Sequence, residues 1–279
     1  MTEAFLDRMA EGSARRLEAA RKRVPDTEIA AQAAALPPPP PLVLHPGGFD
    51  IIAELKLRSP SAGTLSEDSS GIEDRVRTYA MGGAAAVSVL TEPERFGGGL
   101  SHLERAAAAL APLRVPAMRK DFLLHPYQVC EARLAGAGGV LAIARILDDG
   151  ALRALVDSAL RLGMFVLLEA FDVAEIERCA NLISAYPGHR RSLPLGLNCR
   201  DLQTLQIDPA RLDAAAGAFP GDVVAVAESG VFSAADAGRL AGCGYRLALI
   251  GTALMQTDDA AALLRDMLQA GRAARAGAQ

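Results

Sequence analysis

Several features are absent from this chain of 279 residues, and each absence excludes a class of protein. The four cysteines show no CxxC pair and no Cys/His spacing of a zinc site, so we expect reduced, structural thiols. No apolar run reaches the roughly 18 residues of a membrane helix. The N-terminal stretch MTEAFLDRMAEGSARR lacks the apolar region of a signal peptide. These absences predict a cytoplasmic protein without a membrane partner.

The chain also lacks an excess of charge, because its formal net charge is only −4. We therefore expect no general attraction to nucleic acid or to anionic membranes, and any bound anion must be held by a local site. No GxGxxG motif follows the first apolar run, which disfavours a dinucleotide-binding fold. What the chain does have is 51% hydrophobic and 22% charged residues, enough to bury a large core.

The N-terminal part differs in pattern from the rest. Phe5, Leu6 and Met9 begin an apolar series at helical spacing, which predicts a helix over residues 3–35. A run of prolines at residues 37–41 then predicts a stiff, extended linker. We expect residues 1–48 to form a helical extension with this linker, and residues 49–279 to form the catalytic domain.

Beyond the linker, eight short apolar runs alternate with segments of helical period. Each unit spans roughly 25–35 residues, the length of one βα repeat. Eight repeats in a chain of this length predict a closed (β/α)₈ TIM barrel, with an open doubly wound sheet as the alternative. The expected strands are residues 51–56, 84–90, 115–120, 139–145, 164–169, 195–198, 223–228 and 246–251.

Polar residues gather at the ends of these expected strands. The active site of a barrel lies at the carboxyl ends of its strands and in the loops that follow. In the first strand Glu54 and Lys56 share a side, because side chains alternate with period two, while Ala53 and Leu55 face the outer helices. Charges that point into a barrel must be paired or functional. Four further strands end in Lys120, Glu169, Asn198 and Glu228.

The last two loops suggest a phosphate site. Ser229 and Gly230 follow the seventh strand, and Gly251 and Thr252 follow the eighth. The corresponding loops of barrel enzymes often hold a phosphate with backbone N–H groups. Glycine allows a close approach of the backbone, and the two hydroxyls add donors.

Lysines close to carboxylates indicate acid–base chemistry. A lysine beside carboxylates stays protonated and can donate a proton to a carbonyl or a leaving hydroxyl. The residues by themselves predict proton-transfer or lyase chemistry on a sugar phosphate. A Schiff-base aldolase that uses Lys56 or Lys120 fits the same pattern.

Six segments in the same order resemble the indole-3-glycerol-phosphate synthase family over almost the full length of the chain. The resemblance also covers FLDRM near the N-terminus and IGTALM near the C-terminus, and the N-terminal helix and linker are similar to a family extension that packs over the catalytic face. The segments are IIAELKLRSPSAG (51–63), VSVLTEPERFGGG (87–99), RKDFLLHPYQV (119–129), LLEAFD (167–172), GLNCRDLQTLQID (196–208) and AESGVFSAAD (227–236).

The resemblance implies a reaction on 1-(2-carboxyphenylamino)-1-deoxyribulose 5-phosphate. Ring closure onto the C2 carbonyl, followed by loss of carbon dioxide and water, gives indole-3-glycerol phosphate without a metal or an organic cofactor. Lys120 resembles the general acid of ring closure, Glu169 the carboxylate of the later proton transfers, and Lys56 the second lysine near the phosphate. The resemblance also implies orienting roles for Glu54, Asn198 and Glu228, an anthranilate pocket of Phe122 and Pro60 with Ser59 and Arg200 nearby, and a phosphate site of Ser229, Gly230, Gly251 and Thr252.

A few positions depart from the family pattern. Ala62 stands where many members have lysine, Phe171 where a histidine is common, and Thr252 where serine or an acidic residue is usual. The stretch at residues 181–192, NLISAYPGHRRS, is an apparent insertion, which we expect to form a surface loop opposite the active site. These departures spare the six principal polar residues and are compatible with a role in tryptophan biosynthesis or in a dedicated indole pathway.

Two other functions are considered. The related barrel enzyme phosphoribosylanthranilate isomerase would rely on a Cys/Asp pair, but the first strand carries Glu-x-Lys and no cysteine. A catalytically silent barrel that only binds a phosphorylated ligand is the second alternative. In each case the expected partner is a small phosphorylated molecule, and the protein is expected to be a monomer or a homodimer.

Overall fold

The computed structural model describes residues 3–56, 58–59, 63–64, 71–201 and 206–277. Within these residues, parallel strands close into a barrel in the order β1-β10-β9-β8-β7-β6-β5-β4, and β4 pairs with β1. This closure confirms the (β/α)₈ barrel and excludes the open sheet. The strands lie within about two residues of the predicted ranges: β1 (Asp50–Leu55), β4 (Ala86–Leu90), β5 (Ala117–Lys120), β6 (Gly139–Ile143), β7 (Phe165–Ala170), β8 (Leu195–Asn198), β9 (Ala225–Glu228) and β10 (Leu247–Ile250).

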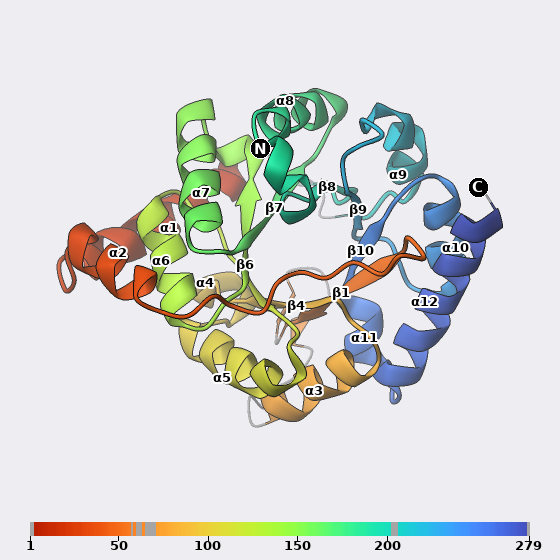
Figure 1. Cartoon of the computed structure of the whole chain (residues 1–279), viewed down its shortest axis with the longest axis horizontal. Helices are drawn as coiled ribbons and strands as arrows, with labels where there is room; N and C mark the ends of the chain where they lie inside the picture. The colour runs from red at the N-terminus through yellow and green to blue at the C-terminus, as the bar shows by residue number, and fades with distance from the viewer. Residues whose placement is uncertain (1–2, 57, 60–62, 65–70, 202–205, 278–279) are drawn as a thin grey trace.

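Helices surround the barrel as an outer ring (Figure 1). The ring consists of α3 (Ile72–Met81), α5 (Leu100–Leu110), α6 (Pro126–Leu134), α7 (Asp149–Arg161), α8 (Val173–Ser184), α9 (Ala210–Ala215), α10 (Ala234–Gly242) and α12 (Ala260–Gly277). Shorter segments lie in the loops: α4 (Pro93–Phe96), α11 (Thr252–Gln256), the paired strands β2 (Arg58–Ser59) and β3 (Gly63–Thr64), and the 3₁₀ turns Ala111–Leu113, Ala144–Ile146, Pro187–Ser192 and Ala216–Ala218. No described helix is both long and apolar enough to cross a membrane.

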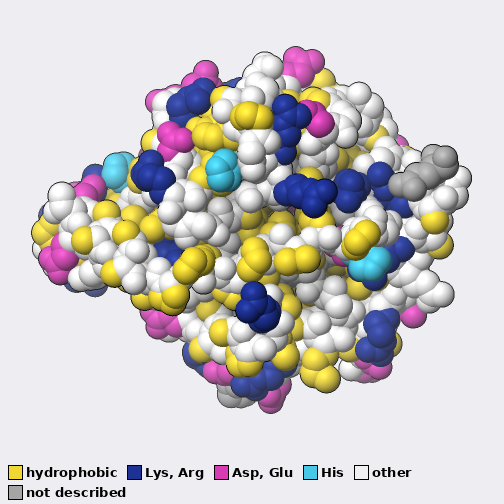
Figure 2. All heavy atoms as spheres, viewed as in Figure 1, with side chains coloured by type: hydrophobic (Ala, Val, Ile, Leu, Met, Phe, Trp, Pro, Cys, Tyr) yellow, Lys and Arg dark blue, Asp and Glu magenta, His cyan; other side chains and the backbone are white. Residues whose placement is uncertain are grey.

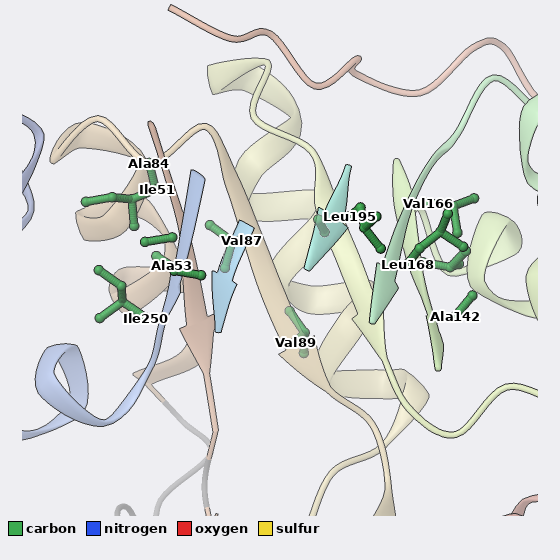
Figure 3. Packing of buried hydrophobic residues seen from close by; sticks show 14 of the residues in the cluster. Ile51, Ala53, Ala84, Val87, Val89, Ala142, Val166, Leu168, Leu195 and Ile250 are labelled. Carbon is green, nitrogen blue, oxygen red and sulfur yellow. The ribbon is translucent and has the colours of Figure 1, made fainter. Parts of the chain in front are cut away.

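Alternation along the strands produces two separate apolar cores. Ala53 and Leu55 belong to the outer core between the strands and the helices, as predicted from the period of two (Figure 3). Ile52, Met118 and Leu167 belong to the inner core, which fills the barrel. Apolar side chains fill the barrel interior, so the charged residues at the carboxyl ends of the strands lie directly above the inner core.

The N-terminal extension is helical over the predicted residues 3–35, but it contains two helices where one was expected. Helix α1 covers Glu3–Arg21 and α2 covers Asp26–Ala34. Pro25 separates them with extended backbone angles, φ −63° and ψ 153°, and it has no N–H to continue a helix. Leu6 and Met9 of α1 are buried in the inner core, at the carboxyl ends of the strands.

The proline linker crosses the opposite end of the barrel. Pro39 lies against Gly163, just before β7, and Pro40 lies against Gly138, just before β6. Leu44, farther along, packs against the inner core from the amino ends of the strands. In Figure 1 the linker runs in front of the strands before it enters β1. The first 45 residues therefore cover both ends of the barrel.

The apparent insertion at residues 181–192 lies opposite the active site, as predicted, but it forms regular turns of helix where a loop was expected. Its first residues complete α8, which ends at Ser184. Its last residues form the 3₁₀ turn Pro187–Ser192. Leu182 and Ile183 are buried in the outer core, which explains why this part continues the helix.

Candidate active site

The principal polar residues occupy inward positions at the carboxyl ends of the strands. Glu54 follows Ile52 of the inner core by two residues, Lys120 follows Met118, and Glu169 follows Leu167. The same period of two that directs the apolar side chains into the barrel therefore directs these charges above them. The predicted strand-end cluster forms in one place.

Lys120 lies between two carboxylates. Its Nζ is 3.1 Å from Oε2 of Glu169 and 3.4 Å from Oε2 of Glu228. Burial alone would lower the pKa of Lys120, but the charges of Glu169, Glu228 and Glu54 raise it above the ordinary lysine value. Lys120 is therefore held as an ammonium ion, ready to donate a proton.

Glu228 is the most confined of these carboxylates, with 1% of its surface exposed. Its Oε1 has no hydrogen-bond partner among the described residues. A Cβ atom on Gly196 of the neighbouring strand would lie only 2.1 Å from this oxygen, so any other residue there in β8 would displace the carboxylate. Burial, and then the charge of Glu169, raise the pKa of Glu228 well above the ordinary value. Of the two carboxylates beside Lys120, Glu228 is thus the one that favours a bound proton.

Asn198 is fixed by hydrogen bonds from the loops. Its Oδ1 accepts from the backbone N–H of Arg200 and from Oγ of Ser229, both at 3.0 Å. Because both loop groups are donors, the amide atom that they contact must be the oxygen. Nδ2 then faces Glu169 and donates to its Oε2 at 3.3 Å. Asn198 thereby connects Glu169 with the loop after β9.

A second lysine–carboxylate pair lies at the end of β1. Nζ of Lys56 is 3.1 Å from Oε1 of Glu54 and donates to Oγ1 of Thr252 at 3.0 Å. Burial would raise the pKa of Glu54, but Lys56 and Lys120 lower it below the ordinary value. Glu54 is therefore ionised and stabilises both ammonium groups.

The two predicted phosphate loops meet the site differently. Ser229 and Gly251 line the cavity at the site. Gly230 does not line it, and a Cβ atom there would point towards Cys199 and Pro209. Ser229 has φ +67° and Gly230 has φ +73°, so two successive residues adopt the left-handed conformation after β9. This conformation is costly for serine and is characteristic of functional loops.

A cavity of about 140 Å³ connects these groups. Arg200 lines it beside the two clusters, and burial lowers the pKa of Arg200. One wall is aromatic, and on it Phe122 lies 6.4 Å from both Phe5 and Phe96, measured between ring centroids. The residues that line the cavity are Phe5, Leu6, Glu54, Lys56, Leu90, Phe96, Lys120, Asp121, Phe122, Leu141, Ile143, Glu169, Phe171, Asn198, Arg200, Glu228, Ser229, Leu249 and Gly251.

Several of these lining residues were not predicted individually. Phe5 and Leu6 come from α1, which agrees with the expected extension over the catalytic face. Phe96 comes from α4, where Glu92 caps the helix by accepting hydrogen bonds from three backbone N–H groups. Phe171, noted as a departure from the family pattern, also lines the cavity, and the guanidinium of Arg145 lies 5.1 Å from its ring centroid.

One predicted pocket residue lies outside the part of the chain that the structure describes. Pro60 lies outside the described residues, as does Ala62. Ser59 belongs to the short strand β2, in the loop that follows β1.

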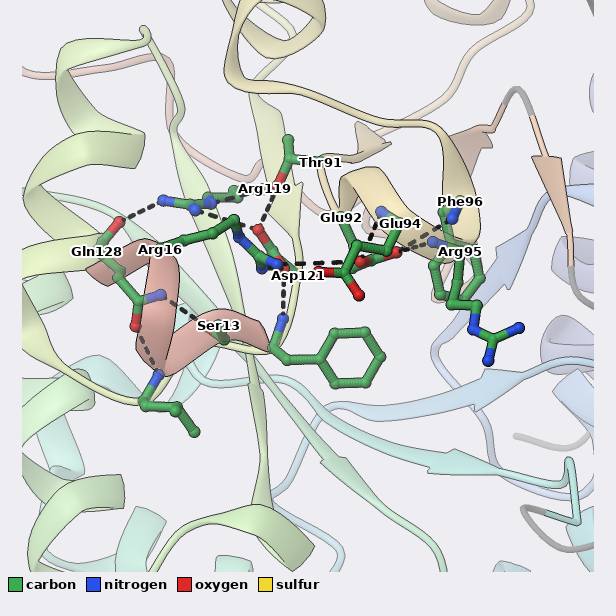
Figure 4. Close-up of polar contacts among 12 residues, drawn as sticks. Ser13, Arg16, Thr91, Glu92, Glu94, Arg95, Phe96, Arg119, Asp121 and Gln128 are labelled. Carbon is green, nitrogen blue, oxygen red and sulfur yellow. Dashed lines mark hydrogen bonds and ion pairs between the residues drawn. The ribbon is translucent and has the colours of Figure 1, made fainter. Parts of the chain in front are cut away.

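Helix α1 is anchored over the site by buried polar contacts (Figure 4). Nη2 of Arg16 donates to Oδ1 of Asp121 at 2.8 Å, and Ser13 accepts from Nε2 of Gln128 at 2.8 Å. Asp121 also accepts from the backbone N–H of Phe122, at 2.9 Å, and its other oxygen accepts from Arg119. Arg119 points away from the barrel interior, opposite to Lys120. These contacts connect α1 to Asp121, which directly follows Lys120, and to Gln128 of α6.

Among the described residues, no group of three or more His, Cys, Asp or Glu side chains is arranged to hold a metal ion. The chemical groups that the site provides are two ammonium groups, three carboxylates, an amide and a guanidinium. They are suited to proton transfer on an anionic substrate.

Comparison with known proteins identifies the family. Residues 6–267 match the family described as "Indole-3-glycerol phosphate synthase". The chain is 39% identical over 249 residues to a relative of that name from Opitutus terrae, covering 87% of this chain and 90% of the relative. It is 41% identical over 258 residues to one from Micrococcus luteus, covering 90% of this chain and 92% of the relative.

Solved structures support the fold alone. A 3-hexulose-6-phosphate synthase aligns with a TM-score of 0.62 at 16% identity, covering 80% of this chain and 99% of that one. A thiamine phosphate pyrophosphorylase from Pyrococcus furiosus aligns with a TM-score of 0.54 at 12% identity, covering 82% of this chain and 97% of that one.

The family match over residues 6–267 and the identity of about 40% to the relatives from Opitutus terrae and Micrococcus luteus decide the family. The chain belongs to the indole-3-glycerol phosphate synthase family.

Proposed function

We propose that this protein is a carboxy-lyase that forms indole-3-glycerol phosphate from 1-(2-carboxyphenylamino)-1-deoxyribulose 5-phosphate. Family membership supports the reaction, and one observation carries the chemistry. Lys120 lies within 3.4 Å of two carboxylates and is therefore kept protonated at the floor of a cavity with an aromatic wall. Such a group can protonate a carbonyl oxygen while a carbon–carbon bond forms.

The cavity suggests how the substrate is oriented. The carboxyphenyl ring fits the aromatic wall of Phe122 and its neighbours, with Arg200 close to its carboxylate. The phosphate fits the loops after β9 and β10, where Ser229, Gly230, Gly251 and Thr252 supply hydroxyls and backbone N–H groups. The sugar carbons then lie between the two lysines.

The first step closes the ring. The aromatic carbon that bears the carboxylate attacks C2 of the sugar, and Lys120 gives its proton to the carbonyl oxygen, which becomes a hydroxyl. Glu169, fixed by Asn198, keeps Lys120 in position and can return a proton to it. Cleavage of the bond to the carboxylate then releases carbon dioxide and restores the aromaticity of the ring.

The last step removes water. The C2 hydroxyl takes a proton and leaves as water, assisted by the electrons of the ring nitrogen, and loss of a proton from C1 then forms the C1–C2 double bond. Lys56 is the proposed donor because it is a second ammonium group, bound to Glu54 and Thr252 on the phosphate side. Glu169 is the proposed acceptor of the remaining proton, and Glu228 orients Lys120.

A direct assay tests this function. The deoxyribulose phosphate substrate is added to the purified protein, and indole fluorescence is followed. The chain has no tryptophan, so the protein contributes no indole signal of its own. We expect product at micromolar enzyme. Binding of the substrate without product formation would reject the proposal and favour the silent ligand-binding barrel.

We also propose that the protein works in the cytoplasm, as a monomer or a homodimer, without a nucleic-acid partner. The net charge of −4 and the absence of disulfides among the four cysteines support this setting. In the same proposal, residues 1–48 act as a cover for a catalytic domain of residues 49–279. The burial of Leu6 and Met9 at the site supports that division.

A further inference from the structure

A second cleft lies at the amino ends of the strands, on the far side of the inner core from the catalytic cavity. Its volume is about 790 Å³, and its walls come from the linker, the turn Pro187–Ser192, the loops before β9 and β10, and α12. Four basic side chains line it: His45, Arg191, Arg246 and Arg275. Figure 2 shows a band of Lys and Arg side chains on the face that the linker crosses.

Two of these guanidinium groups are fixed close together. Nε of Arg246 donates to the carbonyl oxygen of Gly48 at 2.8 Å, and Nη1 of Arg275 donates to that of Gly244 at 3.0 Å. Gly48 has φ +86°, and a Cβ atom there would lie 3.1 Å from Nε of Arg275 and 3.7 Å from Nε of Arg246. Glycine at this turn therefore lets both side chains converge.

Neither guanidinium has an acidic partner among the described residues. Their anchors are neutral carbonyls, which hold the side chains in place and leave most of their N–H donors unused. Asp222 is the one acidic residue that lines the cleft, and it is paired with Arg190. Burial, and then the charge of Arg246, lower the pKa of Arg275.

The apparent insertion contributes to this arrangement. The turn Pro187–Ser192 carries Arg190, which neutralises Asp222, and Arg191, which lines the cleft. The insertion has no part in the proposed catalytic chemistry. In the cleft it adds the positive charge of Arg191, and its Arg190 neutralises the negative charge of Asp222. An excess of unpaired positive charge remains, on a protein whose net charge is −4.

We propose that this cleft is a second ligand site, which binds the dianionic phosphate group of a small phosphate monoester. Two preorganised guanidinium groups match a phosphate because each can donate two parallel hydrogen bonds. Leu44, Pro46 and Phe219 line the same cleft and offer an apolar wall for the body of the ligand. The site is separate from the catalytic cavity and does not depend on the reaction there.

A fluorescent reporter can isolate this site from the catalytic one. The chain contains no tryptophan, and Phe219 lies in the cleft with its ring 5.5 Å from that of Tyr245, so Phe219→Trp introduces one local indole. Inorganic phosphate and phenyl phosphate are titrated at constant ionic strength. We expect a saturable fluorescence change, and Arg275→Gln in the same background should raise the apparent Kd about tenfold.

Arg265→Gln is the matched control, because Arg265 is exposed on the same helix and outside the cleft. It should leave the Kd within about twofold, well below the tenfold loss of one charge-assisted contact. Equilibrium dialysis of radiolabelled phosphate against the chain without tryptophan gives a second measurement, in which Arg275→Gln should weaken the binding of one phosphate by the same factor. No saturable signal in either measurement, or equal losses in the two variants, would overturn the proposal.

Discussion

The two ends of the barrel both collect charged side chains, but they balance them in opposite ways. At the carboxyl end, Lys120 and Lys56 each contact carboxylates within 3.4 Å. At the amino end, Arg246 and Arg275 are anchored by backbone carbonyls and contact no carboxylate among the described residues. The same barrel thus carries one internally neutralised cluster and one unneutralised pair.

The difference teaches what each end is able to do. Neutralised clusters of buried acids and bases can exchange protons without a change in total charge, which suits catalysis. An unneutralised pair of guanidinium groups gains most from an anion that arrives from outside. Charge balance therefore distinguishes a site for chemistry from a site for binding alone, and the predictions below test that distinction.

The largest effect is expected when the neutralised cluster loses its ammonium group. Lys120→Ala should lower kcat by about 10²–10⁴-fold, the usual contribution of a positioned general acid. Folding should persist, because Glu228 can take up a proton when its counter-charge is removed. A discontinuous product assay measures kcat, and circular dichroism measures folding. Lys22→Ala, at an exposed position just after α1, is the control and should leave kcat unchanged.

The next effect concerns the space that the cluster requires. Gly196→Ala places a methyl group where Oε1 of Glu228 now lies, so Glu228 must move away from Lys120. We expect the free energy of unfolding in urea to fall by about 1–3 kcal/mol, together with a loss of kcat. Gly188→Ala is the control, since nothing lies within 4 Å of its new Cβ atom. Equal stability of the two variants would show that the cluster tolerates displacement.

Protonation of the cluster should make stability depend on pH. The pKa of Glu228 is raised in the folded state, so its proton stabilises the fold at low pH. That contribution is lost as pH rises from the unfolded value, about 4.3, through the raised value. Glu228→Gln cannot ionise, and its free energy of unfolding relative to the unsubstituted protein should therefore increase from pH 5 to pH 8. The same difference in the free energy of unfolding between the two proteins at pH 5 and at pH 8 would contradict the raised pKa.

The smallest effect is expected at the unneutralised end. Arg275→Gln loses one bond to Gly244 but relieves the repulsion from Arg246. Its free energy of unfolding should stay within about 0.5 kcal/mol of the unsubstituted value, and added salt should reduce any gain. A loss above about 1 kcal/mol would indicate that the arginine pair supports the fold and is not held open for a ligand.

Much of the barrel could be predicted from the sequence because its physical signal is local. A buried parallel strand is a short apolar run, and the period of two fixes which neighbours point inward, so Glu54 and Lys56 could be assigned to one side from the sequence. Helix ends were less predictable. Pro25 divides the N-terminal helix, although the apolar spacing continues across it.

The strand-end cluster could be predicted because every strand ends at the same face, but individual contacts outside that repeated pattern could not. Phe5 meets Phe122, and Arg16 meets Asp121, across more than a hundred residues, and no local pattern encodes such pairs. The need for glycine at position 196 was also hidden, because it arises from a side chain on the adjacent strand. The basic cleft is a similar case, since its arginines come from separate segments that only the closed barrel brings together.

The N-terminal extension has a consequence for the order in which the molecule is completed. Its residues cover both ends of the inner core, yet the ribosome makes them before any strand of the barrel exists. Leu6 and Leu44 must therefore remain without some of their partners until β9 and β10, which carry Val226 and Leu249, have been made. Loop closure over such separations is slow, so the extension should dock late in folding. A molecule caught before that moment would have a barrel with an uncovered carboxyl end, and Lys56 and Lys120 would still face water.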